Sequence, residues 1–288
     1  MNRRWMFVSV LALLASGAQD PEAKKEYAKD GVLWAASWKE AQEEAFFRNV
    51  PIYIAFHKDE SDPCLEMANT VYPDKKFIEA SRMWVNVAAH RVTSHSVDVM
   101  IKGKKVSLCS RYWNIPCATH SMCYEPPKRK YGVLDECPFR IFADPESKEL
   151  ARELGAKSVD ELLQAMAKIQ ERVPGAKITG PEWIQVQKLR GDGEKLLADK
   201  EWAKAIDAYT RLGKFATEKV KLMGEDGLER VGKEGEKLYV DAIQLAQSED
   251  KKKIDEGVKL FRKIAKEFKP LPVAKKADEQ AKAYSKRP

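Results

Sequence analysis

The stretch that decides the fold is PIYIAFH at residues 51–57, which SDPC follows at residues 61–64. The first stretch is apolar and rich in β-branched and aromatic side chains, so it predicts a buried strand. Residues 64–72 then have the spacing of an amphipathic helix. The chain therefore delivers Cys64 from the end of a buried strand to the start of a helix, where a thiol can become reactive.

Strands and helices alternate on both sides of this unit. One helix has a clear start, because Asp160 and Glu161 follow the capping residue Ser158 and place negative charge at the positive end of the helix dipole. The alternation up to about residue 172 predicts an α/β domain. Between the second and third strands, residues 91–136 predict a long irregular insert. The remaining predicted elements are helices at residues 38–49 and 75–80 and strands at residues 83–88 and 139–143.

The sequence changes character after the dipeptides PG at 174–175 and GP at 180–181, which bracket a predicted linker. Residues 181–288 contain no cysteine or histidine, and their helical periodicity predicts an all-α domain. Residues 193–209 resemble a degenerate tetratricopeptide repeat, with small residues for helix contacts and a large aromatic residue at the turn, and residues 257–277 repeat this weakly. A plain helical bundle or hairpin is the alternative.

The N-terminus is typical of a secretory signal peptide at residues 1–18. Two arginines provide the positive start, residues 5–15 form a short apolar run, and residues 16–18 are the small side chains of a cleavage site. We therefore expect export to the periplasm or the extracellular space, with the α/β domain at residues 19–173. An uncleaved N-terminal anchor is the alternative. No later stretch is apolar enough to span a bilayer, so no membrane span is expected after signal removal.

The composition restricts the possible partners. The formal net charge is +7, and lysine and arginine are interleaved with acidic residues as on solvated helix faces. No basic patch with interleaved aromatic residues stands out, so we expect no nucleic acid and favour a protein partner for the helical tail. All five cysteines lie in the first half of the chain. In an oxidising compartment they favour disulfides, and the odd count leaves at least one free, metal-bound or paired between chains.

Residues 31–172 resemble an exported thioredoxin-like domain through four features in the same order. They are the helix around Trp38, SDPC in place of the family's C-x-x-C motif, ECPF at residues 136–139 in place of its cis-proline, and the hairpin and final helix that begin at residues 142–150. The resemblance implies a thioredoxin-like α/β fold, in which a central mixed sheet is flanked by helices. It also implies a cis peptide bond before Pro138.

In that family the first cysteine of the motif is the exposed nucleophile, and the second resolves the mixed disulfide. Ser61 replaces the nucleophile here, and Cys64 matches the resolving thiol. Because a serine hydroxyl cannot form a mixed disulfide, ordinary dithiol oxidoreductase activity should be absent at this motif. The resemblance also places Cys137, beside Pro138, within possible reach of Cys64 for a disulfide or a shared metal ion. Two small buried side chains are the alternative. His57 could lower the pKa of Cys64.

The insert packs four potential metal ligands into fifteen residues: Cys109, Cys117, His120 and Cys123. Thiolates with an imidazole are ligands that Zn or Cu(I) prefers, and four of them would complete a tetrahedral site. The alternative is a disulfide from Cys109 to Cys117 or Cys123, which would staple a loop with little core of its own. His90 and His95, just after the second strand, could add ligands.

Three functions follow from these features. The first is thiol–disulfide redox handling through a monothiol SxxC site at Cys64, with Cys137 and Pro138, at most as an oxidoreductase or isomerase. The second is binding of Cu(I) or Zn through the insert cysteines and His120. The third is a non-catalytic binding module whose helical tail docks a protein partner. Ser61 favours the third over the first, and the insert favours the second.

Overall fold

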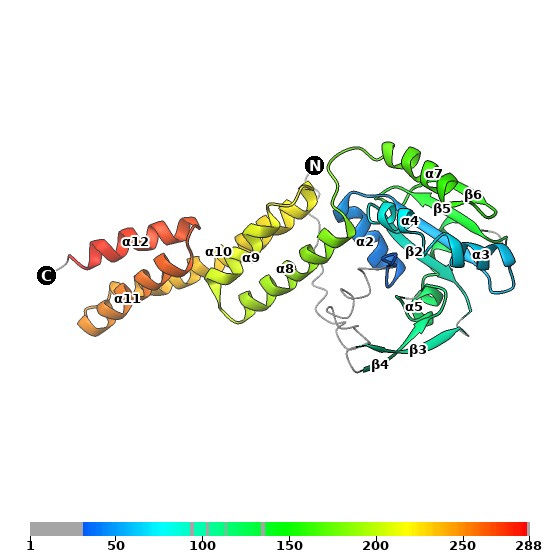
Figure 1. Cartoon of the computed structure of the whole chain (residues 1–288). Helices are drawn as coiled ribbons and strands as arrows, with labels where there is room; N and C mark the ends of the chain where they lie inside the picture. Colours follow the sequence, from blue (N-terminus) through cyan, green and yellow to red (C-terminus); the bar gives the residue numbers. More distant parts are fainter. Residues whose placement is uncertain (1–30, 93–94, 102–103, 113, 134–135, 287–288) are drawn as a thin grey trace.

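The computed structural model describes residues 31–286 apart from residues 93–94, 102–103, 113 and 134–135. An α/β part ends with helix α7 (Val159–Glu171), and a helical tail extends away from it (Figure 1). The predicted signal peptide at residues 1–18 lies outside the described residues and stays a prediction.

Four strands form the central sheet in the order β2-β1-β5-β6: β1 (Ile52–His57), β2 (Val85–His90), β5 (Phe139–Ala143) and β6 (Glu149–Leu154). β1 pairs parallel with β2 and antiparallel with β5, and β5 pairs antiparallel with β6, so the sheet is mixed as expected. The three predicted strands are confirmed, with ends within two residues of the observed ones. β1 lies inside the sheet and every one of its residues is buried, which explains its continuous apolar sequence.

Helices cover both faces of the sheet. Besides α7 they are α2 (Trp38–Arg48), α3 (Asp62–Thr70), α4 (Lys75–Ser81) and α6 (Glu125–Tyr131). Because side chains alternate along a strand, Tyr53 of β1 packs with residues of α3, α4 and α7 on one face. Ile54 packs with residues of α2 and α6 on the other face. Ser158 caps α7 with a capping box, which confirms the predicted start of that helix.

The insert is more regular than predicted. Its described residues form an antiparallel hairpin, β3 (Ser96–Ile101) and β4 (Lys104–Cys109), and the helices α5 (Cys117–Met122) and α6. The prediction of a long irregular segment was therefore wrong for these residues. Much of the hairpin is exposed, so polar pairs such as Asp98 with Ser107 alternate with apolar ones and hide the strand pattern.

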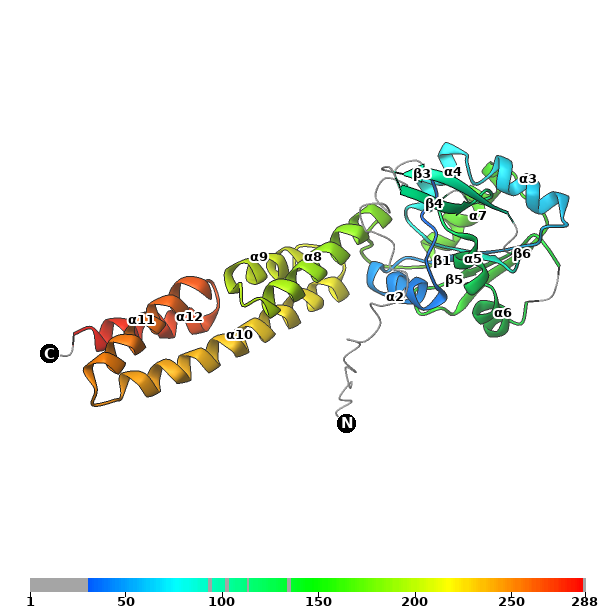
Figure 2. The ribbon, with the colours of Figure 1, turned by 90° about the horizontal axis from the view of Figure 1, so that it is seen from below.

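The elements described after α7 are all helices: α8 (Gly180–Ala198), α9 (Trp202–Leu212), α10 (Glu218–Ala246), α11 (Lys251–Glu267) and α12 (Pro272–Tyr284). α8 and α9 form a hairpin beside the α/β part, and α11 and α12 form a second hairpin at the far end (Figures 1 and 2). The long α10 packs along both hairpins. This confirms the predicted helical region. Within the described residues, no helix has both the length and the apolar composition needed to cross a membrane.

The side chain of Arg48 joins α2 to the segment that leads into the tail. It is almost fully buried, and it donates hydrogen bonds to the carbonyl oxygens of Ile178 (3.1 Å), Trp84 (3.0 Å) and Arg82 (2.5 Å). A salt bridge to Glu44 at 2.5 Å offsets part of the cost of burying the charge. The predicted linker is therefore held firmly against the α/β part.

Gly227 of α10 is a close-contact position in the tail, because a Cβ atom added there would overlap the ring of Tyr209. We expect Gly227→Ala to lower the free energy of unfolding by about 1–3 kcal/mol, since overpacking forces neighbouring groups out of place. Gly191→Ala in α8 is the matched control. No neighbouring atom of the described chain packs within 4 Å of its added Cβ, so helix propensity should stabilise this variant by up to about 1 kcal/mol. Urea unfolding measures both, and equal stabilities would contradict the close packing.

Candidate functional site

Cys64 and Cys137 form a pair of thiols beside the sheet. Cys64 lies in the first turn of α3 with its side chain fully buried, and its N–H donates to the carbonyl oxygen of Ser61 at 2.9 Å. Cys137 precedes Pro138 just before β5 and is only partly buried. The peptide bond between Cys137 and Pro138 is cis, as the resemblance implied. The two thiols are hydrogen-bonded to each other. The structure thus brings together the residues that the sequence suggested for a redox site.

The surroundings of Cys64 favour its thiolate. The hydrogen bond from Cys137 has the largest effect, and together with His57 and Ser61 it lowers the pKa of Cys64 to about 4 even though burial raises it. His57 acts through a hydrogen bond and its charge, and Ser61 through a hydrogen bond. The His57 ring is itself buried, with Nε2 2.5 Å from the hydroxyl of Tyr72. Ser61, which occupies the position of the nucleophile in a C-x-x-C motif, therefore stabilises the thiolate of Cys64 instead.

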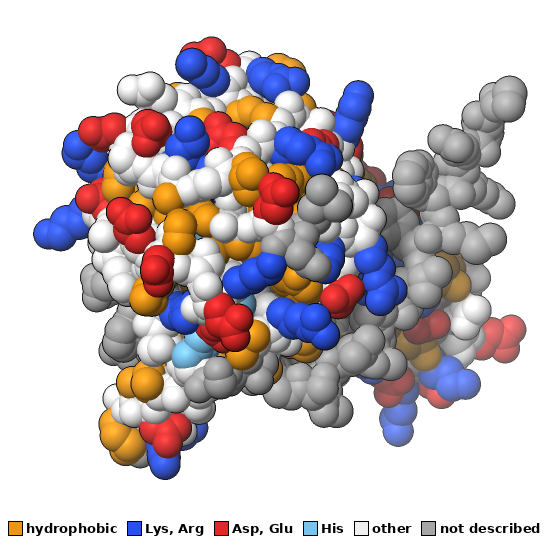
Figure 3. Space-filling model, turned by 90° about the vertical axis from the view of Figure 1, so that its right-hand side faces the viewer, with side chains coloured by type: hydrophobic (Ala, Val, Ile, Leu, Met, Phe, Trp, Pro, Cys, Tyr) orange, Lys and Arg blue, Asp and Glu red, His pale blue; other side chains and the backbone are white. Residues whose placement is uncertain are grey.

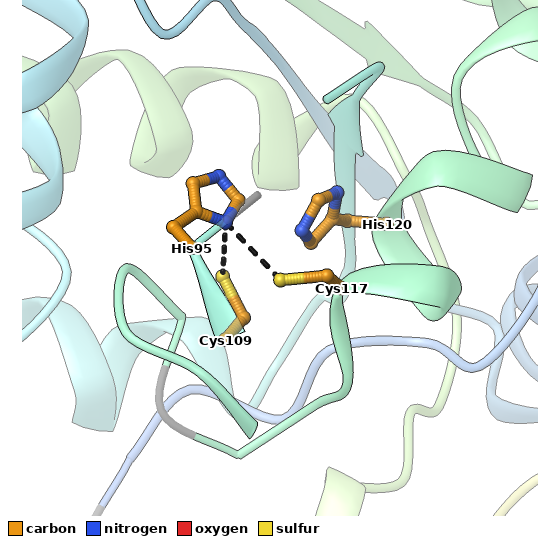
Figure 4. Close-up of side chains that lie close together, drawn as sticks. All are labelled: His95, Cys109, Cys117 and His120. Carbon is orange, nitrogen blue, oxygen red and sulfur yellow. Dashed lines mark hydrogen bonds between the residues drawn. The ribbon is translucent and has the colours of Figure 1, made fainter. Parts of the chain in front are cut away.

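A second group of side chains lies in the insert, and we call it the Cys–His cluster (Figure 4). It consists of His95, Cys109, Cys117 and His120, whose potential ligand atoms lie within 4.8 Å of one another. The hairpin of β3 and β4 pairs Ser96 with Cys109, and this brings His95 to Cys109. Cys117 and His120 lie one turn apart on α5, so they share a face of that helix.

Both imidazole rings of the cluster turn one nitrogen toward the cysteine sulfur atoms (Figure 4). His95 Nδ1 lies 3.1 Å from Cys117 Sγ and 3.7 Å from Cys109 Sγ. His120 Nδ1 lies 2.8 Å from the carbonyl oxygen of His90, to which it can donate. This leaves His120 Nε2 buried and without a hydrogen-bond partner in the part of the chain that the structure describes. A buried nitrogen with a free lone pair is what a metal ligand requires.

Burial sets the protonation states of the cluster. It lowers the pKa of His120 to about 4 and also lowers the pKa of His95, so both rings are neutral at pH 7. Burial also raises the pKa of Cys109 to about 12, so this thiol needs a nearby positive charge before it loses its proton. Neutral imidazoles and cysteines that deprotonate on binding are the groups from which proteins build transition-metal sites. The cluster could therefore bind a metal ion.

Three of the four residues predicted as metal ligands lie in the cluster, but Cys123 does not. Its Sγ lies 3.9 Å from the carbonyl oxygen of Ala35, in the core on the other face of the sheet. Cys123 follows the last residue of α5 and, at about 100° per residue, lies about 120° around the helix axis from Cys117, so the two thiols point to different sides. His95, one of the two histidines noted after the second strand, stands beside the cysteines instead. Cys64, Cys109, Cys117 and Cys123 are free thiols in the structure.

Asp59 links the cluster to the loop between β1 and α3. Its Oδ1 lies 2.9 Å from Arg111 Nη2 and 3.3 Å from the Nε2 atoms of both His90 and His95. Arg111 also approaches two backbone carbonyl oxygens of this loop, at 3.4 and 3.5 Å. Asp59 and Arg111 were not predicted, because single charged residues in loops carry no sequence signal of which partners they will meet.

No family model matches the chain, and no curated protein matches it. Among solved structures, one of a "DsbH Oxidoreductase" is similar over 48% of this chain and 85% of its own, with 18% sequence identity and a TM-score of 0.31.

Proposed function

We propose that the protein is a thioredoxin-like thiol–disulfide redox protein whose working thiols are Cys64 and Cys137. The observation that carries the proposal is the hydrogen bond between these thiols, which favours a thiolate at neutral pH. The mixed sheet with helices on both faces is compatible with a thioredoxin-like fold. Because Ser61 cannot form a mixed disulfide, the SxxC motif supplies a single thiol, and the second comes from the segment before β5.

The reaction assigned to the pair is reduction of a substrate disulfide. Cys137 is the more exposed thiol, so it attacks one substrate sulfur after passing its proton to Cys64, and the first substrate thiolate leaves. The proton then moves from Cys64 to that thiolate, and the Cys64 thiolate attacks the sulfur of Cys137. This step releases the second substrate thiolate and forms the Cys64–Cys137 disulfide. An external dithiol must then reduce the protein disulfide to complete a cycle.

A redox titration tests the proposal. We expect wild-type protein in mixtures of reduced and oxidised dithiothreitol to lose the thiols of Cys64 and Cys137 together, with a single midpoint. Alkylation followed by peptide mass spectrometry identifies the residues involved. Insulin reduction should fall at least about tenfold in both serine variants, since Cys137→Ser cannot form the mixed disulfide and Cys64→Ser cannot resolve it. Cys123→Ser is the control, because Cys123 packs in the core beneath α2 and α6 and is not part of the thiol pair. Equal rates of insulin reduction in the wild type and in Cys64→Ser would contradict the proposal.

Binding of Zn or Cu(I) is a second candidate function. The observation that favours it is the close approach of two thiols and two imidazoles in the Cys–His cluster. Metal analysis of protein purified without an affinity tag tests this function. About one metal ion per chain is expected, and a clearly substoichiometric content would argue against it.

Export and a protein partner complete the proposal. Export to the periplasm or the extracellular space is supported by the signal-like pattern at residues 1–18. The helical tail, with its tetratricopeptide-like pattern at residues 193–209, is the proposed docking region for a protein partner. Cell fractionation with N-terminal sequencing tests export, and a chain beginning near residue 19 is the expected result.

A further inference from the structure

We propose that His95, Cys109, Cys117 and His120 form a tetrahedral zinc site, and that Asp59 couples this site to the loop carrying Cys64. The proposal rests on the second candidate function, metal binding, and names the metal, its ligands and its effect. It departs from the ligand set suggested by the sequence, because His95 stands where Cys123 was expected.

The spacing of the ligand atoms fits zinc. With Zn–S bonds of about 2.3 Å and Zn–N bonds of about 2.0 Å, the ligand atoms of a tetrahedral site lie about 3.3–3.8 Å apart. His95 Nδ1 lies 3.1 Å from Cys117 Sγ and 3.7 Å from Cys109 Sγ, and no pair in the cluster exceeds 4.8 Å. Shifts of a few tenths of an ångström to about 1 Å would complete the geometry.

The donor set favours zinc over Cu(I). Two thiolates and two imidazoles form the S₂N₂ set of structural zinc sites, and the two negative charges balance the dication. An oxygen atom lies near the second nitrogen of each ring. His120 Nδ1 is 2.8 Å from the carbonyl oxygen of His90, and His95 Nε2 is 3.3 Å from Asp59 Oδ1, within ion-pair range but without the alignment of a hydrogen bond. Such partners fix the tautomer and orientation of a metal-bound histidine. His120 Nε2 is buried without a hydrogen-bond partner among the described residues. Burying a polar atom in this way costs free energy, and coordination to a metal ion would offset that cost.

One ligand of the cluster is partly exposed to solvent. Cys109, Cys117 and His120 are buried, but the side chain of His95 is 12% exposed. Figure 3 shows histidine surface at the α/β end of the molecule, among acidic and basic side chains. His95 is therefore the most exposed of the four ligands.

Asp59 carries the coupling between the two sites. It lies in the loop that ends at Ser61, and its Oδ1 meets both His95 Nε2 and Arg111. A zinc ion on Nδ1 makes the Nε2–H of His95 a stronger donor, so it should hold the Asp59 carboxylate more tightly. Arg111 already approaches two carbonyl oxygens of the same loop. A loaded site should therefore restrain the loop that positions the fully buried Cys64.

Metal titration tests the ligand set. We expect reduced, chelator-treated wild-type protein to bind one Zn²⁺ per chain, and Co²⁺ to give the visible spectrum of tetrahedral S₂N₂ coordination. Affinity should fall at least about 100-fold in Cys109→Ser and in His95→Gln, and stay unchanged in Cys123→Ser. Circular dichroism checks that each variant is folded. If a variant does not fold, the cobalt spectrum of the wild-type protein still tests the tetrahedral coordination. Binding lost in Cys123→Ser and kept in His95→Gln would overturn the ligand set. A preference for Cu(I) over Zn²⁺ would overturn the assignment of zinc. No binding of either ion would overturn metal binding as a function.

Thiol accessibility tests the coupling. A buried thiol is alkylated only when the structure opens locally, so zinc should slow alkylation of Cys64 by about tenfold. Peptide mass spectrometry separates Cys64 from the cysteines that zinc protects directly. Asp59→Asn should remove the slowing while the protein still binds zinc, and Asp62→Asn, an exposed position of the same segment, should keep it. An unchanged Cys64 rate in zinc-loaded wild type would overturn the coupling. The redox role of Cys64 and Cys137 is measured separately, so either proposal can fail alone.

Discussion

Replacing Arg48 by alanine should lower the free energy of unfolding by about 3 kcal/mol or more. The guanidinium donates to three backbone carbonyl oxygens, those of Ile178, Trp84 and Arg82, at a site where its own exposure is 1%. Each buried acceptor left without a donor costs about 1–3 kcal/mol. Burial lowers the pKa of Arg48, which shows that the charge is costly to bury and is retained for these bonds.

Urea unfolding followed by circular dichroism measures this effect. Arg48→Lys should recover only part of the stability, because a single ammonium group cannot reproduce the planar fork of a guanidinium. Arg129→Ala is the control. Arg129 is largely exposed and pairs with Glu125, so its loss should cost no more than about 1 kcal/mol. A similar, small loss for both alanine variants would contradict the role assigned to Arg48.

The stability of the reduced protein should rise with pH between about 4 and about 8.5 because of Cys64. Its pKa is about 4 in the folded protein, whereas a cysteine in an unfolded chain has a pKa of about 8.5. In this window the unfolded chain binds more protons, so the free energy of unfolding increases with pH by up to about 1.4 kcal/mol per pH unit. The contribution of Cys64 to stability is complete above its pKa in the unfolded chain. It is lost as the pH falls through its pKa in the folded protein.

Comparison with Cys64→Ala measures the contribution of Cys64 and its coupled neighbours, because titrating groups elsewhere affect both proteins equally. The difference in free energy of unfolding should grow with pH across the window. Thiolate absorbance near 240 nm should give a low pKa in wild type and a higher one in Cys137→Ala, which removes the largest effect that lowers it. A difference that does not change with pH would show that Cys64 is protonated in the folded state.

Much of the α/β fold was predictable because its signals are local. The apolar run of β1, the cap of α7 by Ser158 and the periodicity of the tail each lie within a few residues of the chain. The hairpin in the insert was missed because it is largely exposed and gives only a weak alternation of polar and apolar residues. An exposed hairpin does not need the apolar face that makes a strand visible in a sequence.

The candidate sites depended on contacts that no local pattern encodes. The proximity of Cys64 and Cys137 was suggested by the resemblance, not by the residues between them. The register of the β3–β4 hairpin places His95 beside Cys109. Cys123 lies outside the cluster because it follows the last residue of the short helix α5 and points to another side. Asp59 gains its importance from three partners that are distant in sequence. A change of one residue in the hairpin register would have changed the membership of the cluster.

The attachment of the connecting segment has a consequence for how the molecule can be divided. Asn49 donates to the carbonyl oxygens of Pro174 and Ala176, and Ile178 donates to the carbonyl oxygen of Arg48. A chain cut at residue 173 would leave the end of α2 with these donors and acceptors unpaired. The smallest part of the chain that folds independently therefore extends into α8. The α/β part and the first helical hairpin should unfold in one cooperative transition rather than in two separate ones.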